Sequence, residues 1–138
     1  MEFTASHHPL RIFVVENDTV LLPALETHLT LLGHEVNTAR DLREALHELP
    51  SNPSDLLLCD LKLPDGTGWQ LLRELGPQRP AVAVAMSGYC SAPDLARSHR
   101  AGFDHHLIKP FSPGELTPIL DQTSALCALS PAPRSPRP

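Results

Sequence analysis

The sequence of 138 residues predicts an α/β fold, a doubly wound (βα)5 parallel sheet of five strands with helices on both faces. Two observations predict it. Short apolar, β-rich runs alternate five times with stretches of helical periodicity. The connections between them are short, as right-handed crossovers between parallel strands require. Hydrophobic content of 41% with only 4% aromatic residues indicates one domain with an aliphatic core.

Two strand–helix pairs open the chain. The β-rich run Arg11–Val15 is the first strand, and residues 19–32 form the first helix because their leucines recur at near-helical spacing before a glycine stop signal. Pro23 is tolerated there because it falls close to the first turn. The second pair is a brief strand, Glu35–Ala39, and a helix that Asp41 caps and that runs to about residue 49.

The next two pairs are built on the most apolar runs. Residues 56–59 are apolar on both faces, as a central parallel strand is. The third helix, Gly68–Leu75, ends at a Gly-Pro pair. Residues 81–86, with the sequence AVAVAM, form the fourth strand, and residues 92–100 form the fourth helix, with a glycine just past its end.

The last pair contains a conflict of signals. His105–Ile108 is a weak fifth strand, and the stretch from Ser112 to Glu115 is a capping-box signature that opens a helix to about residue 126. Pro118 lies past the first turn of a helix that starts there, where it removes a backbone hydrogen bond. We therefore expect a kink, a late start or a shortened helix.

Composition excludes several classes of function. A net charge of −5 and a pI near 5.8 argue against a direct nucleic-acid or anionic-membrane surface. No apolar run approaches the roughly 20 residues that cross a bilayer, and the first residues lack a signal-peptide core, so we expect a cytoplasmic protein. The three cysteines form no C-x-x-C and are interpreted as reduced thiols.

Polar side chains gather where the predicted strands end. Because the carboxyl ends of parallel strands share one edge of the sheet, these residues are expected at a single site. Burying Asp60 at the end of an apolar run is costly unless Lys109 and a divalent cation compensate it. The residues that follow strands one, three, four and five are Glu16, Asn17 and Asp18, then Asp60, Ser87 and Lys109.

Four stretches, RIFVVEND, LLLCDLKLPDGTGW, VAMSGY and AGFDHHLIKPF, in this order and spacing, resemble the receiver domain of response regulators of bacterial two-component (phosphorelay) systems. The resemblance covers about residues 10 to 126. We place a receiver domain at 10–128, a flexible leader at 1–9 and a proline-rich disordered tail at 129–138. The resemblance implies the flavodoxin-like strand order 2-1-3-4-5 and phosphoryl transfer from a histidine kinase, or a histidine phosphotransfer protein, to Asp60.

The same resemblance implies a metal site and a phosphoryl site. Ser87 and Lys109 would each bind a phosphoryl oxygen, and the Lys109–Pro110 peptide bond is expected to be cis. Lys62 and Tyr89 occupy positions that tune phosphoryl lifetime. Mg²⁺ (or Mn²⁺) would be held by Glu16, Asn17, Asp60 and the backbone carbonyl of Lys62.

Two positions depart from the family pattern. Asn17 stands where a second acid is usual, so Mg²⁺ binding should be weaker; Asn17 also fits a local turn former. His106 stands where an aromatic switch residue that follows Ser87 inward is common, and histidine would make the switch sensitive to pH near neutrality. Asp60 itself has a competing interpretation as a turn or helix-cap carboxylate.

The leading hypothesis is a single-domain receiver, not a conventional enzyme, because the chain after the last helix is too short for an effector domain. It would signal by docking another protein through its fourth helix, fifth strand and fifth helix, by relaying the phosphoryl group, or as a homodimer. The alternative is a pseudo-receiver, a phosphorylation-independent binding module, which Asn17 and His106 favour. A dehalogenase-type phosphatase would need an acid in place of Lys62, and a flavodoxin a Ser/Thr/Gly-rich first loop.

Overall fold

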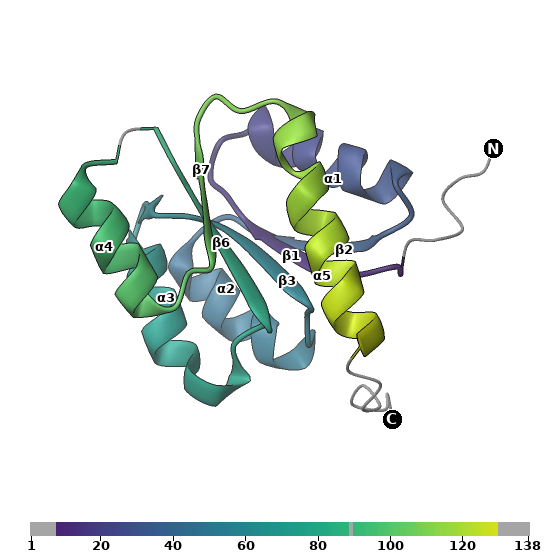
Figure 1. Cartoon of the computed structure of the whole chain (residues 1–138). Helices are drawn as coiled ribbons and strands as arrows, with labels where there is room; N and C mark the ends of the chain where they lie inside the picture. Colours follow the sequence, from purple (N-terminus) through teal and green to yellow (C-terminus); the bar gives the residue numbers. More distant parts are fainter. Residues whose placement is uncertain (1–7, 89, 130–138) are drawn as a thin grey trace.

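The computed structural model describes residues 8–88 and 90–129 (Figure 1). Five parallel strands form one sheet in the order β2-β1-β3-β6-β7, which confirms the predicted 2-1-3-4-5 arrangement. Its strands are β1 (Arg11–Val15), β2 (Glu35–Ala39), β3 (Leu56–Asp60), β6 (Val82–Ser87) and β7 (His105–Ile108). The helices are α1 (Leu21–Leu31), α2 (Leu42–Glu48), α3 (Gly68–Leu75), α4 (Ala92–Ala101) and α5 (Thr117–Leu129).

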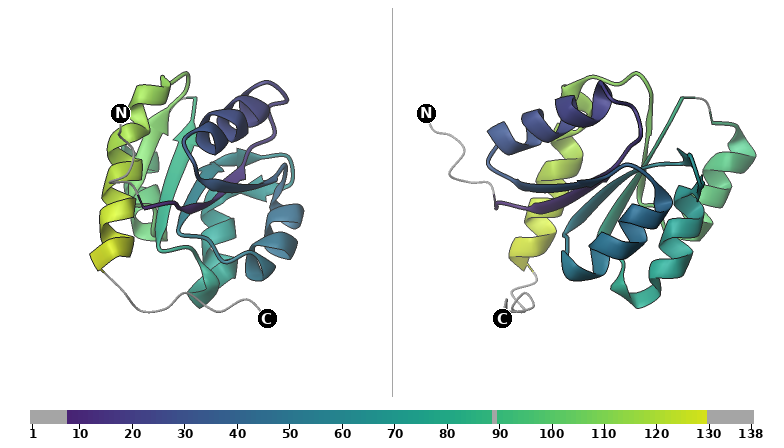
Figure 2. Two further views of the ribbon diagram at one scale, coloured as in Figure 1. Left: turned by 90° about the vertical axis from the view of Figure 1, so that its right-hand side faces the viewer. Right: turned by 180° about the vertical axis from the view of Figure 1, so that it is seen from behind.

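The helices cover both faces of the sheet, with α1 and α5 on one side and α2, α3 and α4 on the other (Figures 1 and 2). Alternate strand residues therefore enter two separate cores. Phe13 and Val15 of β1 pack with leucines of α2 and α3, whereas Ile12 and Val14 pack with leucines of α1 and α5. This explains why the central strands are uninterrupted apolar runs.

The first helix begins later than predicted. Residues 19–32 were predicted to be helical, but α1 spans Leu21–Leu31, with Val20 as its N-cap residue and the Asp18 carboxylate beside its first amides. The Asp18 Oδ1 atom accepts hydrogen bonds from the amides of Val20 at 2.8 Å and Leu21 at 3.0 Å. Amides of a first helical turn have no partner within the helix, so a carboxylate just before it stabilises the start.

A late start resolves the conflict in the last helix. The capping box of Ser112 and Glu115 exists, but it closes a 3-10 turn, Pro113–Glu115, and not the helix itself. Helix α5 begins at Thr117, which puts Pro118 in its first turn, where the missing amide costs no hydrogen bond. Of the three outcomes left open by the sequence, the late start is the one observed.

A short hairpin between β3 and α3 was not predicted. It pairs β4 (Lys62–Leu63) with β5 (Gly66–Thr67) in antiparallel fashion.

The ends of several elements also differ from the prediction. Strands β3 and β6 each end one residue later than predicted, so Asp60 and Ser87 are the last residues of their strands and do not follow them. The second helix ends at Glu48 and passes into the 3-10 turn Leu49–Ser51. Apart from residues 8, 9 and 129, the predicted leader and tail lie outside the described residues.

The buried core and the exposed helix surface should respond differently to the same truncation. Leu58 of β3 is fully buried, whereas Leu31 at the end of α1 is 81% exposed. Leu58→Ala should lower the free energy of unfolding by about 2–5 kcal/mol through lost burial and a residual cavity. Leu31→Ala should change it by less than about 0.5 kcal/mol. Urea unfolding of both variants measures the difference, and equal losses would contradict the assigned register of β3.

Candidate functional site

The register of the sheet brings the predicted residues to one edge. Val15 pairs with Cys59 and Ser87 pairs with Ile108, so the residues at the ends of these strands converge. Backbone hydrogen bonds hold the chain where it leaves the strands: the Glu16 amide donates to the Ala39 carbonyl at 3.0 Å, and the Lys109 amide donates to the Ser87 carbonyl at 2.7 Å.

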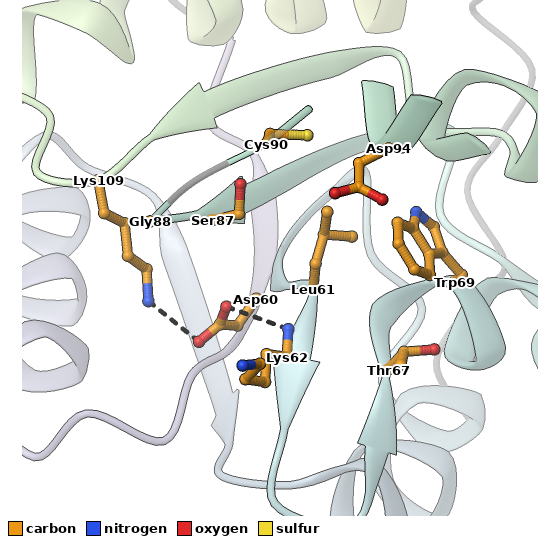
Figure 3. A pocket seen from close by; sticks show the side chains of 10 residues that line it. All are labelled: Asp60, Leu61, Lys62, Thr67, Trp69, Ser87, Gly88, Cys90, Asp94 and Lys109. Carbon is orange, nitrogen blue, oxygen red and sulfur yellow. Dashed lines mark hydrogen bonds and ion pairs between the residues drawn. The ribbon is translucent and has the colours of Figure 1, made fainter. Parts of the chain in front are cut away.

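Lys109 joins the two buried acids of this edge. Its Nζ atom lies 2.6 Å from Glu16 Oε1. It also lies 3.0 Å from Asp60 Oδ2, a contact drawn as a dashed line in Figure 3. Glu16 is only 1% exposed, so the Lys109 ammonium supplies the charge that its burial requires. The predicted pairing of Lys109 with Asp60 is therefore present in the structure. The Lys109–Pro110 peptide bond is cis, as the resemblance implied.

Burial and ion pairing oppose one another at these groups. Burial raises the pKa of Glu16 above its ordinary value, although Lys109 and the Asp18 amide, which donates to Glu16 Oε2 at 2.9 Å, oppose the rise. Burial alone would lower the pKa of Lys109, but its hydrogen bonds to Glu16 and Asp60 hold that pKa above the ordinary value. With both acids ionised, the three side chains carry one uncompensated negative charge.

An open cavity of about 460 Å³ lies over these acids. Asn17 and Asp18 are both exposed at the wall of this cavity. One oxygen of the Asp18 carboxylate already accepts the Leu21 and Val20 amides at the start of α1, and these hydrogen bonds hold the pKa of Asp18 below its ordinary value. The residues that line this cavity are Glu16, Asn17, Asp18, Asp60, Lys62, Leu63, Pro64 and Lys109.

The oxygen donors around this cavity fit Mg²⁺. No three His, Cys, Asp or Glu side chains group as metal ligands anywhere in the described ranges, so a cation here would need neutral oxygens as well. Those oxygens are the Asn17 amide, the Lys62 carbonyl and waters, beside the carboxylates of Glu16 and Asp60. Mg²⁺ binds through one or two carboxylates and keeps several waters, and the uncompensated negative charge favours a cation.

Lys62 belongs to both the edge and the hairpin. Its amide donates a long hydrogen bond of 3.4 Å to Asp60 Oδ1, drawn as a dashed line in Figure 3. Asp60 Oδ2 is bound to Lys109, so Oδ1 is the less strongly held oxygen of that carboxylate. The Lys62 side chain is exposed.

Ser87 contacts His106 on the neighbouring strand. The Ser87 hydroxyl and the His106 Nε2 atom lie 2.8 Å apart, and Nδ1 is buried without a hydrogen-bond partner among the described residues. Burial lowers the pKa of His106 below its ordinary value of 6.5, and Asp94 opposes this only in part. His106 is therefore neutral at pH 7 and is already paired with the residue that sequence reasoning assigned as its switch partner. Tyr89, assigned to phosphoryl lifetime, lies outside the described residues.

A second cavity of about 670 Å³ opens on the other side of Asp60, and sequence reasoning missed several residues of its wall. Trp69 was interpreted as helix packing, and it does pack against the buried core. In addition, its Nε1 donates to Ser98 Oγ at 2.8 Å, and the Arg97 guanidinium lies over its ring at 3.9 Å from the centroid. No sequence signal marked this link between α3 and α4. The cavity lining shown in Figure 3 is Asp60, Leu61, Lys62, Thr67, Trp69, Ser87, Gly88, Cys90, Asp94 and Lys109.

Comparison with known proteins identifies one family. The family model described as response regulator receiver domain matches residues 12–121. The transcriptional regulatory protein PrrA of Mycobacterium bovis is 36% identical over 107 residues, which are 77% of this chain and 46% of that protein. The KDP operon transcriptional regulatory protein KdpE of Escherichia coli is 32% identical over 105 residues, 76% of this chain and 47% of that protein.

The solved structures agree with the sequence relatives. A CheY-like response regulator receiver domain protein of Methanospirillum hungatei superposes with a TM-score of 0.77 at 31% identity, covering 86% of this chain and 99% of that one. The chain thus spans less than half the length of the curated relatives but nearly all of this structural neighbour. Over residues 8–88 and 90–129, no helix combines the length and apolar character needed to cross a membrane.

The partly buried His106 should make folding stability depend on pH. The unfolded chain takes up this proton near pH 6.5, and the folded protein only at a lower pH. The free energy that neutral His106 contributes to folding is therefore fully present above pH 6.5. It is lost as the pH falls from the pKa of the unfolded chain toward the lower pKa of the folded protein. Urea unfolding between pH 7.5 and pH 5 should show a larger loss for the unsubstituted protein than for His106→Gln. Parallel curves would show that His106 titrates normally.

Proposed function

The chain belongs to the response regulator receiver domain family, and on that premise we propose that it is a phosphorylation switch whose acceptor is Asp60. The observation that carries the proposal is the Lys109 ammonium, which bridges Glu16 and Asp60 beside an open cavity. A carboxylate that forms an acyl phosphate needs neutralisation of the incoming phosphoryl charge more than it needs proton transfer.

Each side chain of the edge has a role in this transfer. The carboxylate of Asp60 attacks phosphorus through Oδ1, and the P–N bond of the phosphohistidine donor breaks as the P–O bond forms. Lys109 and the Ser87 hydroxyl each bind a phosphoryl oxygen once the group is attached. The donor is a histidine kinase or a histidine phosphotransfer protein. No substrate other than the phosphoryl group is converted, so the protein is not a conventional enzyme.

Receiver domains generally bind Mg²⁺ at their acidic phosphorylation site. For this chain we assign the ligands Glu16, Asn17, Asp60 and the Lys62 carbonyl, which line or border the same cavity. The cation supplies positive charge opposite the phosphoryl oxygens. Asn17 offers a neutral oxygen in place of a carboxylate. This site would therefore attract the cation less strongly than a site with two adjacent acids.

Output is proposed through the surface formed by α4, β7 and α5. Ser87 links this surface to the acceptor because its hydroxyl already contacts His106 of β7. The surface exposes large apolar side chains that suit docking of a protein: Leu95 is 44%, Ile108 47% and Leu126 55% exposed. A downstream protein, or a second copy of the chain, would bind there in the cytoplasm.

The second candidate function is a pseudo-receiver that binds a partner without phosphorylation. The exposed amide Asn17 favours it, because fewer charged ligands weaken the metal on which phosphoryl transfer depends.

Acetyl phosphate tests the main proposal directly. Incubation with Mg²⁺ should add one phosphoryl group to the protein, and the adduct should be absent without Mg²⁺ or in Asp60→Asn, which lacks the nucleophilic carboxylate. Intact-mass spectrometry measures the product. A Mg²⁺-dependent beryllofluoride titration then separates a short-lived phosphoryl group, which still permits binding, from a pseudo-receiver, which does not bind. Absence of both adduct and binding would overturn the proposal.

Placing an acid at position 17 should increase the affinity of the site for Mg²⁺. Asn17→Asp adds a charged oxygen at the wall of the cavity, and Mg²⁺ affinity should rise by roughly tenfold or more, since affinity follows the number of charged ligands. Titration with Mg²⁺ followed by the fluorescence of Trp69, the single tryptophan of the chain, measures the effect. Asp18→Asn is the matched control and should leave Mg²⁺ affinity unchanged, because the Asp18 carboxylate binds amides at the start of α1. If Asp18→Asn lowered Mg²⁺ affinity as much as Asn17→Asp raised it, this assignment would be contradicted.

A further inference from the structure

The hairpin that follows the acceptor strand is too small to hold its own shape. It consists of two residue pairs, Lys62 with Thr67 and Leu63 with Gly66. A two-stranded hairpin is marginally stable by itself in water, even when longer than this one. Its geometry matters because Lys62, the residue assigned to offer a carbonyl to Mg²⁺, is its first residue. The position of that carbonyl therefore depends on what ties the hairpin to the rest of the fold.

The tip of the hairpin is tied to helix α2. The Asp65 Oδ1 atom accepts a hydrogen bond from the Leu42 amide at 2.8 Å, and Oδ2 accepts one from the Arg43 amide at 3.0 Å. These amides belong to the first turn of α2 and have no partner within the helix. Burial alone would raise the pKa of Asp65, but the Leu42 and Arg43 amides hold that pKa below its ordinary value.

Close packing reinforces the same attachment. A Cβ atom at Gly66 would lie 2.5 Å from Leu42 Cδ2, so the hairpin backbone rests directly on the first side chain of α2. The base of the hairpin is held separately, by the Gly68 amide, which donates to the Leu61 carbonyl at 3.0 Å, and by Thr67 Oγ1, which caps α3. The base is thus fixed to the sheet and to α3, and Leu63 is buried in the core. The tip is tied to α2 by Asp65 and by the contact of Gly66 with Leu42, and Gly66 also lies against Gln70 of α3.

From these contacts we propose that Asp65 is a positioning residue of the metal site: by clamping the hairpin to α2, it holds the Lys62 backbone in register with Asp60. The inference rests on the proposed function, because the Mg²⁺ role of the Lys62 carbonyl comes from it. Asp65 touches neither Asp60 nor the phosphoryl group in this scheme, and it acts only through the hairpin. Removal of such an indirect support costs metal affinity without removing a ligand.

Two substitutions at the N-terminus of α2 isolate this effect. Asp65→Ala removes the clamp, and Asp41→Ala removes the other acidic cap of the same helix, which accepts from the Glu44 amide at 2.8 Å and, among the described residues, makes no hydrogen bond to the hairpin. Calorimetric titration with MgCl₂ should show an affinity loss of roughly tenfold for Asp65→Ala, the scale typical of outer-shell support, and no change for Asp41→Ala. Urea unfolding should show that both variants remain folded.

Asp65→Asn separates position from charge. It removes the same negative charge as Asp65→Ala but keeps one oxygen that accepts an amide, so its Mg²⁺ affinity should lie between that of Asp65→Ala and the unsubstituted protein. Equal losses for both substitutions would mean that charge acts at a distance, and would overturn the inference.

A readout without metal completes the test. Amide hydrogen exchange over residues 61–67 should accelerate in Asp65→Ala and remain slow in Asp41→Ala. Unchanged exchange together with unchanged Mg²⁺ affinity in Asp65→Ala would overturn the inference while leaving the proposed function intact. Failure of the unsubstituted protein to bind Mg²⁺ would overturn both.

Discussion

The pairing of one ammonium with two buried carboxylates is the interaction on which the site depends. Glu16 is almost fully enclosed and Asp60 closes an apolar strand, so burying these two carboxylates is costly without the Lys109 ammonium beside them. Leaving such a buried charge unpaired costs about 3–5 kcal/mol. The same pairing leaves one negative charge uncompensated, and this is the charge that the proposed Mg²⁺ would offset.

The sheet makes this pairing possible. Glu16, Asp60 and Lys109 are separated by long stretches of sequence, and they meet because β1, β3, β6 and β7 are parallel and end at one edge. The two cores on either side of the sheet hold the register, since a slip by one residue would exchange the faces of every apolar side chain. The packing of the aliphatic strand residues thus fixes the positions of the polar side chains at the strand ends.

Two connections extend from the acceptor toward different parts of the fold. On one side, Ser87 meets His106 and so reaches the surface formed by α4, β7 and α5. On the other, Lys62 leads into the hairpin that Asp65 clamps to α2. In the proposed function the first connection would couple the site to its output surface, and the second would set the geometry of the metal ligands. Substitutions along either connection would alter function without touching the acceptor.

The sequence by itself determined the parallel α/β architecture and the residues of the edge, because apolar runs and strand ends are local signals and parallel strands must share an edge; the strand order followed from the resemblance to receiver domains. It missed the hairpin, although Pro64-Asp65-Gly66 is a turn signal, because two-residue strands are too short to show a period. Only the tertiary structure decided that Asp65 reaches α2 and that Trp69 meets Ser98, since no short-range pattern records which amide or hydroxyl a distant part of the fold presents.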